Sequence, residues 1–195
     1  MLEVLDALAP IEARLDGGLG VDALLGEQTR RNDDVDLVIR RRDAYVARAR
    51  LEPLGFVHDS AAVPGLPARL VFRDPSGRQV DLHLIVRDTA GNGWQQLDGG
   101  GWGRYDANGL DAWGAVGGRP VRCVSAELQA RHHRGYDWTP KDRADMERLA
   151  DRFEIVLRGA DPQGAGSGLC NERPQSNGLI TKRPPSRAAA TPGRG

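Results

Sequence analysis

A short segment in which acidic and apolar residues alternate constrains the fold of this chain more than any other feature. It reads Asp-Val-Asp-Leu-Val-Ile at positions 34–39. In a β-strand successive side chains point to opposite faces, so Val35, Leu37 and Ile39 share one face and the two aspartates share the other. The apolar face anchors the strand in a core. The segment therefore predicts a half-buried strand that carries two neighbouring carboxylates.

Turn and capping signals place further elements around this strand. Asp74-Pro75-Ser76-Gly77 has the residues that a type I turn prefers, so two strands flanking it should form a hairpin. Ser125 and Thr139 have the character of helix N-caps. The expected strands are 69–73, 79–86 and 119–124, the expected helices are 2–15, 21–25, 43–50, 126–133 and 140–153, and the Gly- and Trp-rich stretch 91–114 is expected to be a loop. Together they predict the α+β class, a mixed sheet flanked by helices with a C-terminal helical segment.

The character of the chain changes near residue 159. The stretch 159–195 is rich in Gly, Pro, Ser and Arg and shows no helical or strand period. Such a composition buries too little apolar surface to offset the entropy lost on ordering. We therefore expect one folded domain at 1–158 and a disordered tail at 159–195, which is a neutral extension or an interaction arm.

Charge and cysteine content exclude several classes of protein. Lys+Arg and Asp+Glu are both 27, which argues against a nucleic-acid partner bound through excess positive charge. Two cysteines, Cys123 and Cys170, supply neither a zinc site nor a disulfide framework, and Cys123 is expected to be a buried apolar residue. The chain shows no secretory pattern and no apolar run of about 18 residues, so we expect a cytoplasmic protein without a membrane partner.

The paired aspartates predict a metal site. Asp34 and Asp36 have Cα atoms roughly 6.5 Å apart on a strand, which lets a hard divalent cation lie between their carboxylates. Asp81 lies on the strand predicted at 79–86, with apolar residues on its opposite face. If the two strands are neighbours, three carboxylates share one face and need a cation to offset their repulsion. Mg²⁺ is the expected cofactor.

Two glycines precede the acidic strand. Gly17-Gly18 either lets backbone N–H groups approach a phosphate or ends the first predicted helix. The longer run Gly17 to Gly20 is not interpreted as a dinucleotide-binding fingerprint, because the predicted elements lack the order of strand, glycine-rich turn and helix.

These motifs together resemble a known family. The segments 15–26, 29–30, 33–37, 80–83, 118–127 and 131–137 are similar to the antibiotic nucleotidyltransferases of the polymerase-beta-like superfamily, in particular the lincosamide and aminoglycoside 2''-type adenylyltransferases. The resemblance extends from about residue 2 to 155 and implies the polymerase-beta-like nucleotidyltransferase fold. Two positions depart from the family pattern, because Leu19 stands where Trp is usual and Asn32 where His is frequent.

The resemblance implies transfer of AMP from ATP, or of another nucleotide, to a hydroxyl of a small molecule with release of pyrophosphate. Asp34 and Asp36 would hold Mg²⁺, which stabilises charge on the phosphates. Asp81 would act at the acceptor hydroxyl as general base, or as ligand of a second ion. The nucleotide-binding residues would be Gly17, Gly18, Thr29 and Arg30.

Candidate acceptor-binding residues are His83, Trp94, Trp102 and Tyr105. His83 follows Asp81 on the same strand face, where it would contact the acceptor or support the site by a hydrogen bond. The aromatic residues, with Trp113, would line an acceptor pocket or form a small core within their own loop. The adjacent pair His132-His133 is not expected to share a metal ion, because neighbours on a helix point about 100° apart.

The acceptor and two other classes of function stay open. A lincosamide suits the aromatic residues, whereas a polycationic aminoglycoside suits Asp98, Asp106 and Asp111. The alternatives are an antitoxin-like nucleotidyltransferase that modifies a protein partner, and a catalytically decayed nucleotide-binding domain. A homodimer is also left open.

Overall fold

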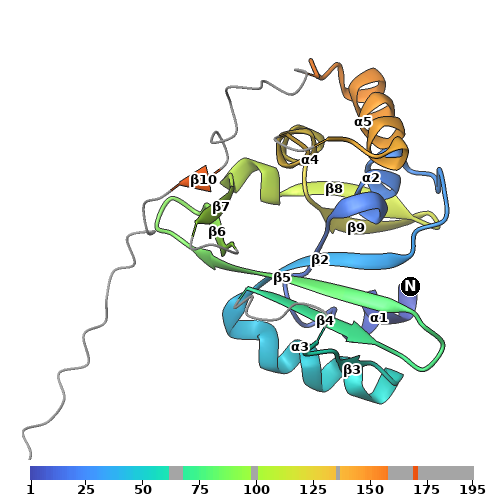
Figure 1. Cartoon of the computed structure of the whole chain (residues 1–195), viewed down its shortest axis with the longest axis vertical. Coiled ribbons are helices and arrows are strands. Elements are labelled where there is room, and N and C mark those ends of the chain that lie inside the picture. Colours follow the sequence, from blue (N-terminus) through green and yellow to red (C-terminus); the bar gives the residue numbers. More distant parts are fainter. Residues whose placement is uncertain (62–67, 98–100, 135–136, 158–168, 171–195) are drawn as a thin grey trace, which may run out of the picture.

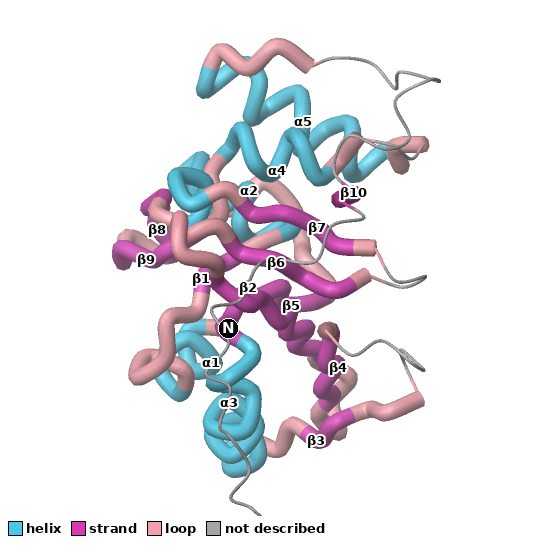
Figure 2. Tube along the Cα trace, turned by 90° about the vertical axis from the view of Figure 1, so that its left-hand side faces the viewer, coloured by secondary structure: helices cyan, strands magenta, loops and turns pink. Residues whose placement is uncertain are grey.

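A mixed sheet crosses the middle of the molecule in the computed structural model. The structure describes residues 1–61, 68–97, 101–134, 137–157 and 169–170. The helices α1 (Leu2–Ala7) and α3 (Ala44–Leu51) lie below the sheet, and α2 (Gly17–Leu25), α4 (Ala126–His132) and α5 (Pro140–Phe153) lie above it (Figures 1 and 2). This arrangement confirms the predicted α+β class.

The longest pairing in the sheet joins two parallel strands at its centre. The strands are β1 (Arg14–Leu15), β2 (Asp34–Arg40), β3 (Val57–His58), β4 (Arg69–Arg73), β5 (Gln79–Arg87), β6 (Gly93–Gln96), β7 (Trp102–Tyr105), β8 (Ala112–Val116), β9 (Arg119–Cys123) and β10 (Leu169–Cys170). Their order is β10-β7-β6-β5-β2-β1-β9-β8, and β4 pairs with β3 and with the first half of β5. The central strands β2 and β5 are parallel over their whole contact.

The two faces of β2 and β5 differ in polarity, as the alternating pattern predicts. Leu37, Ile39, Val80 and Leu82 are fully buried in a core that includes residues of α1 and α3. A second, smaller core lies on the opposite face, where Val38, Ile85 and Tyr105 pack with Leu128 of α4. The acidic residues of β2 share that second face, so the polar site lies on the side of α2 and α4.

The predicted turn and caps are confirmed. Gly77 donates its N–H to the Asp74 carbonyl at 3.0 Å, which closes the turn between β4 and β5. Ser125 caps α4, and Thr139 forms a reciprocal capping box with Asp142 at the start of α5. The 3₁₀ turn Arg41–Asp43 precedes α3, and the 3₁₀ turn Glu52–Leu54 follows it.

The predicted helix at 2–15 is wrong in extent, and Gly17-Gly18 does not end it. α1 stops at Ala7 ahead of Pro10, which has no N–H for a helical hydrogen bond, and the chain continues into β1. Gly17 and Gly18 begin α2, whose N-cap is Asp16. The separate helix expected at 21–25 is the second half of α2.

The predicted loop at 91–114 is also wrong. It contains β6, β7, the 3₁₀ turn Ala107–Leu110 and most of β8. Glycines hide the strand period because they stand where backbone packs closely. A Cβ on Gly93 would overlap Ile85, and a Cβ on Gly114 would overlap the backbone of Ala23 in α2.

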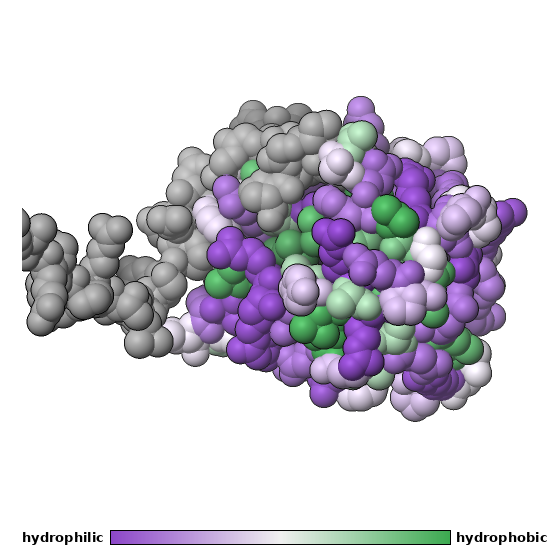
Figure 3. Space-filling model, turned by 90° about the horizontal axis from the view of Figure 1, so that it is seen from below, coloured by the Kyte–Doolittle hydropathy of each residue, from purple (hydrophilic) through white to green (hydrophobic). Residues whose placement is uncertain are grey.

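Most of the predicted tail lies outside the described residues. Its one described segment, β10, pairs antiparallel with β7. The boundary between a domain at 1–158 and a tail at 159–195 therefore stays a prediction. Among the described helices, none is long and apolar enough to cross a membrane. The underside of the molecule, on the side of α3 and β3, shows apolar residues scattered among polar ones (Figure 3).

The contact between Gly114 and α2 yields a stability test. Gly114→Ala should lower the free energy of unfolding by about 1–3 kcal/mol, because the new methyl group meets backbone atoms of Ala23 and Leu24. Gly103→Ala in β7 is the matched control, since a Cβ there makes only ordinary contacts with Leu97. Urea denaturation of both variants measures the difference. Equal stability of the two variants would contradict the close packing of β8 on α2.

Candidate active site

Three carboxylates meet on the polar face of β2 and β5. The parallel register sets Asp36 directly opposite Asp81, and Asp34 precedes Asp36 by two residues on the same face. Each residue offers an oxygen, and these oxygens all lie within 4.8 Å of one another. Asp81 is fully buried, whereas Asp34 and Asp36 are partly exposed. The structure thus brings the three predicted acidic residues together, as the neighbouring-strand hypothesis required.

Protein donors compensate two of these carboxylates and leave the third without a partner. The Arg69 guanidinium of β4 pairs with Asp81 Oδ2, and the Gln79 amide donates to Asp81 Oδ1 at 2.8 Å. Asp36 Oδ1 lies 3.2 Å from His83 Nε2. Within the described part of the chain, the Asp34 carboxylate accepts no hydrogen bond.

The lack of compensation shows in the ionisation of Asp34. Burial raises the pKa of Asp34 above its ordinary value, and the charges of Asp36 and Asp81 raise it further. A hard cation among these oxygens would offset both effects. The donor set, oxygen only and rich in negative charge, therefore fits a divalent metal ion.

The N-terminus of α2 lies against Asp36. Asp16 accepts a hydrogen bond from Gly17 N at 3.0 Å, and its own N–H donates to the Asp36 carbonyl at 3.0 Å. Gly17 has a φ of +56°, and a Cβ on it would overlap the Asp36 carboxylate. The N–H groups of Gly18 and Leu19 donate to no described group, as is usual in the first turn of a helix, and such a helix start is suited to binding an anion.

This turn corrects one step of the sequence interpretation. Strand, glycine-rich turn and helix do follow one another in β1, Gly17-Gly18 and α2. A dinucleotide site of the Rossmann type remains excluded for another reason, because β1 and β2 on either side of α2 are antiparallel. Leu19, at the position of the family's Trp, is buried in the larger apolar core, together with Leu37 and Val80.

The loop between α2 and β2 carries the predicted phosphate ligands. Thr29 donates both its N–H and its hydroxyl to Asp22, and Asn32 donates to the same carboxylate at 2.6 Å. Arg30 forms a two-pronged pair with Asp145 of α5, the closest distance being 2.7 Å. A Cβ on Gly18 would overlap the Arg30 guanidinium, so that charge lies beside the glycine turn.

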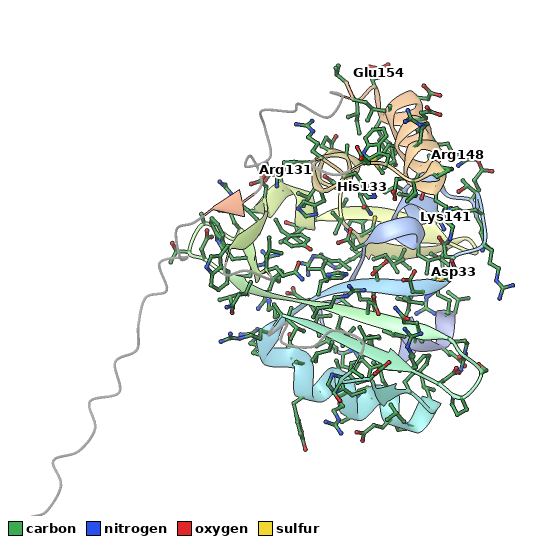
Figure 4. All side chains as sticks on the ribbon, in the orientation of Figure 1. Asp33, Arg131, His133, Lys141, Arg148 and Glu154 are labelled. Atoms are coloured by element: carbon green, nitrogen blue, oxygen red, sulfur yellow. The ribbon has the colours of Figure 1, made fainter. Side chains whose placement is uncertain are left out.

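A second ion pair joins the same loop to α5. Lys141 lies 2.7 Å from Asp33, and both side chains are on the same side of the molecule (Figure 4). Hydrogen bonding to Asp145 raises the pKa of Arg30, so its charge is secure at any physiological pH. Arg30, which lies beside the glycine turn, and Asp33 are therefore held in place by ion pairs with α5.

His83 connects the acidic residues with a buried polar chain. Gln95 Nε2 lies 3.2 Å from His83 Nδ1, and Tyr105 donates its hydroxyl to Gln95 Oε1 at 2.9 Å. Burial lowers the pKa of His83, but the hydrogen bond to Asp36 and the charge of Asp16 outweigh it and raise the pKa. Burial raises the pKa of Tyr105 well above 10, so its hydroxyl keeps its proton.

The structure does not bring the predicted tryptophans to the acidic residues. Strand alternation and register put Trp94 and Trp102 on the opposite face of the sheet from Gln95. Trp94 donates its ring N–H to Asp88 at 2.9 Å, and Trp113 is 58% exposed. Tyr105 alone of the predicted aromatic residues reaches the site, through Gln95.

The acidic residues proposed for a polycationic acceptor are paired with arginines. Asp106 forms ion pairs with Arg104 and Arg131, and Asp111 lies 3.7 Å from Arg14 and 3.9 Å from Arg122. Asp98 lies outside the described residues. The two described aspartates are thus already balanced by positive charge.

The neighbouring histidines are not a pair in space either. His132 Nε2 lies 3.2 Å from the carbonyl of Arg104, whereas His133 Nδ1 lies 2.9 Å from that of Gln129.

An open pocket of about 170 Å³ adjoins Asp34. Met1, Val4, Leu19 and Phe56 give it apolar walls. Its polar lining includes Asp34 and Gln79, the residue that donates to Asp81, together with Gln28, Asn32, Asp33 and Arg78. An uncharged part of a ligand can therefore lie next to Asp34.

Four residues of the site escaped the sequence analysis: Asp16, Arg69, Gln79 and Gln95. Asp16 was readable as an N-cap, since an aspartate directly before two glycines suits a helix start. The hairpin turn fixes the register that sets Arg69 opposite His83, next to the Val71–Asp81 pair. Gln95 lies in a strand without a visible period, and no sequence signal marks it.

Comparison with known proteins identifies the family. The sequence profile of the family described as aminoglycoside-2''-adenylyltransferase matches residues 1–149. The chain belongs to this family. It is a nucleotidyltransferase, and its fold is that of the antibiotic-resistance members of the group. The predicted resemblance and enzyme class are confirmed.

Three members of the group illustrate the similarity. A lincosamide resistance protein of Staphylococcus haemolyticus is 29% identical over 135 residues, which are 69% of this chain and 81% of that protein. The lincomycin-bound lincosamide adenylyltransferase LnuA is 28% identical with a TM-score of 0.65, over 76% of this chain and 92% of that one. The enzyme ANT(2'')-Ia with adenylyl-2''-tobramycin shares the fold, with 20% identity and a TM-score of 0.58 over 78% and 86% of the chains.

The raised pKa of Asp34 leads to a test of stability in the absence of metal. Its raised pKa means that the folded chain favours the protonated carboxyl. Asp34 therefore costs stability as pH rises from the ordinary value of 3.8 through the raised one. Asp34→Asn should raise the melting temperature of metal-free protein at neutral pH and flatten this dependence.

Thermal melts in a chelator across that pH interval measure the effect. Added Mg²⁺ should raise the melting temperature of the wild type more than that of Asp34→Asn, because the variant has lost a ligand. A variant that melts below the wild type without metal would contradict the repulsion among the carboxylates.

Proposed function

We propose that this chain transfers AMP from ATP to a hydroxyl group of a lincosamide antibiotic, with Mg²⁺ as its cofactor. The observation that carries the proposal is the convergence of Asp34, Asp36 and Asp81 beside the open N–H groups of α2. A phosphate-binding turn next to an oxygen-ligand site for a cation is what nucleotidyl transfer requires.

The roles of the acidic residues follow from their surroundings. Asp34 and Asp36 would hold the ion, which when bound neutralises the triphosphate and stabilises charge at the reacting phosphorus. Asp81 is deeper and forms an ion pair with Arg69. We assign it to the acceptor hydroxyl, as general base or as ligand of a second ion.

The phosphates would bind at the start of α2. Gly18 and Leu19 offer free N–H groups, and the N–H of Gly17 supports the turn through Asp16. Arg30 brings a fixed positive charge beside Gly18. Thr29 reaches the phosphates only if its hydroxyl turns away from Asp22, so its contribution to nucleotide binding is through the loop that it stabilises.

A lincosamide is favoured over an aminoglycoside as acceptor. The lincosamide proteins are 28–29% identical to this chain, against 20% for the aminoglycoside enzyme ANT(2'')-Ia. Asp106 and Asp111 lie within ion-pair distance of arginines, which reduces the net negative charge that they offer to a polycation. The pocket beside Asp34 also has apolar walls, which suit an acceptor of low charge.

An acceptor panel tests this function. The full chain is incubated with Mg²⁺ and ATP together with lincomycin, clindamycin, tobramycin or kanamycin, and products are read by mass spectrometry. We expect one adenylyl group on the lincosamides and none on the aminoglycosides. Modification of tobramycin alone would overturn the choice of acceptor, and no product with any antibiotic would overturn the proposed function.

Asp36→Asn tests the metal assignment within the same assay. The rate should fall about 100-fold or more, because even residues that only support metal ligands cost 10–100-fold when removed. Asp6→Asn removes an exposed carboxylate of α1 that pairs with Arg119 and should leave the rate unchanged. Normal transfer by Asp36→Asn would remove this residue from the catalytic machinery.

A further inference from the structure

We propose that Tyr105, Gln95 and His83 form a positioning chain that fixes the Asp36 carboxylate for the metal ion before any nucleotide binds. This inference rests on the proposed function, because it assigns a task to residues behind a metal ligand. None of the three needs to touch the substrate for that task. The chain crosses three strands, β7, β6 and β5, and ends at β2.

The orientation of the Gln95 amide is the first step. Its Nε2 lies 3.3 Å from the carbonyl oxygen of Ala68, which can only accept a hydrogen bond. Its Oε1 receives the hydroxyl of Tyr105 at 2.9 Å. Turning the amide over would set oxygen against oxygen at Ala68, so the NH₂ group must face Ala68 and His83.

The hydrogen-bonding state of His83 follows from that orientation. Gln95 Nε2 donates to His83 Nδ1 across 3.2 Å, so Nδ1 must be an acceptor without a proton. The ring proton is then on Nε2, which donates to Asp36 Oδ1 at 3.2 Å. One tautomer satisfies every contact, and it holds one defined oxygen of Asp36.

Burial makes the chain stiff. Tyr105 is 4% exposed and Gln95 is 8% exposed, so water cannot readily replace their hydrogen bonds. Val38, Ile85 and Leu110 belong to the same apolar cluster as Tyr105 and restrict its ring. The polar chain is therefore anchored in the core above the sheet.

The remaining oxygen of Asp36 is the one that faces the glycine turn. Oδ2 lies where a Cβ on Gly17 would collide with it, and it accepts no hydrogen bond from the described part of the chain. Fixing Oδ1 through His83 thus fixes Oδ2 relative to the phosphate turn. Outer partners of this kind orient metal ligands and tune metal affinity.

Gln95→Glu is the sharpest test. The new carboxylate can only accept, so it should place a proton on His83 Nδ1, either by changing the tautomer or by making the ring an imidazolium. Gln95→Met removes the donor at similar volume and carries the test if the charged variant does not fold. Gln96→Glu, the next residue on the opposite face of β6, is the control for the added charge.

Two measurements read the result without relying on turnover. Binding of Mn²⁺ alone, followed by electron paramagnetic resonance, should weaken about 10–100-fold in both Gln95 variants and stay unchanged in Gln96→Glu. Long-range ¹H–¹⁵N spectra at mildly alkaline pH should show the Nε2–H tautomer of His83 in the wild type and a proton on Nδ1 in Gln95→Glu. Tyr105→Phe should weaken Mn²⁺ binding less, since Gln95 keeps its bond to Ala68.

Contrary outcomes are distinct from failure of the proposed function. Folded Gln95 variants that bind Mn²⁺ like the wild type overturn the positioning chain, as does an Nδ1–H tautomer in the wild type. A wild type that binds no Mn²⁺ without nucleotide overturns the claim that Asp36 is fixed in advance. Absence of product in the acceptor panel, with metal binding and tautomer as expected, overturns the antibiotic transfer alone.

Discussion

The parallel pairing of β2 with β5 is the interaction on which the site depends. It sets Asp36 opposite Asp81 and brings three carboxylate oxygens within 4.8 Å of one another. Two apolar cores clamp this pair of strands from both sides, so the charges cannot move apart to relieve their repulsion. The free energy of apolar burial therefore offsets the repulsion between the carboxylates. A bound cation would reduce that repulsion.

The polar groups around the carboxylates divide the site into two halves. Arg69 of β4 and Gln79 of β5 contact the carboxylate of Asp81, while His83 of β5 contacts the carboxylate of Asp36. Asp34 is left open towards the pocket. Under the proposed function this asymmetry suits a reaction with two substrates, because Asp36 lies beside the turn at Gly17 while the deeper Asp81 is paired with Arg69. The pairing of Asp106 and Asp111 with arginines then argues for an acceptor of low charge.

Sequence alone predicted the central acidic residues and missed what supports them, and the reason lies in the strand pattern. In β2 and β5 apolar and acidic residues alternate, so Asp34, Asp36 and Asp81 were readable together with the turn at Asp74. In β6 and β7 Gly93 and Gly103 stand on the same face as Gln95 and Tyr105, where apolar side chains would have marked a buried face. The alternation of apolar and polar residues is therefore absent from β6 and β7, and this hairpin was predicted as a loop. The hydrogen bonds from Tyr105 through Gln95 to His83 could not be predicted. The first helix ends before Pro10. Gly17 and Gly18, which were predicted to end that helix, begin α2 instead, because Asp16 is its N-cap.

The bond between Arg30 and Asp145 joins residues 115 positions apart, and Lys141 reaches back 108 positions to Asp33. The loop that we propose to face the phosphates is thus bound to the last described helix, α5. During synthesis Arg30 and Asp33 emerge well before Lys141 and Asp145, so these two contacts can form only when most of the domain has been made. A chain that ended before α5 would lack both contacts, so the position of the loop that carries Arg30 and Asp33 depends on a helix made more than 100 residues later.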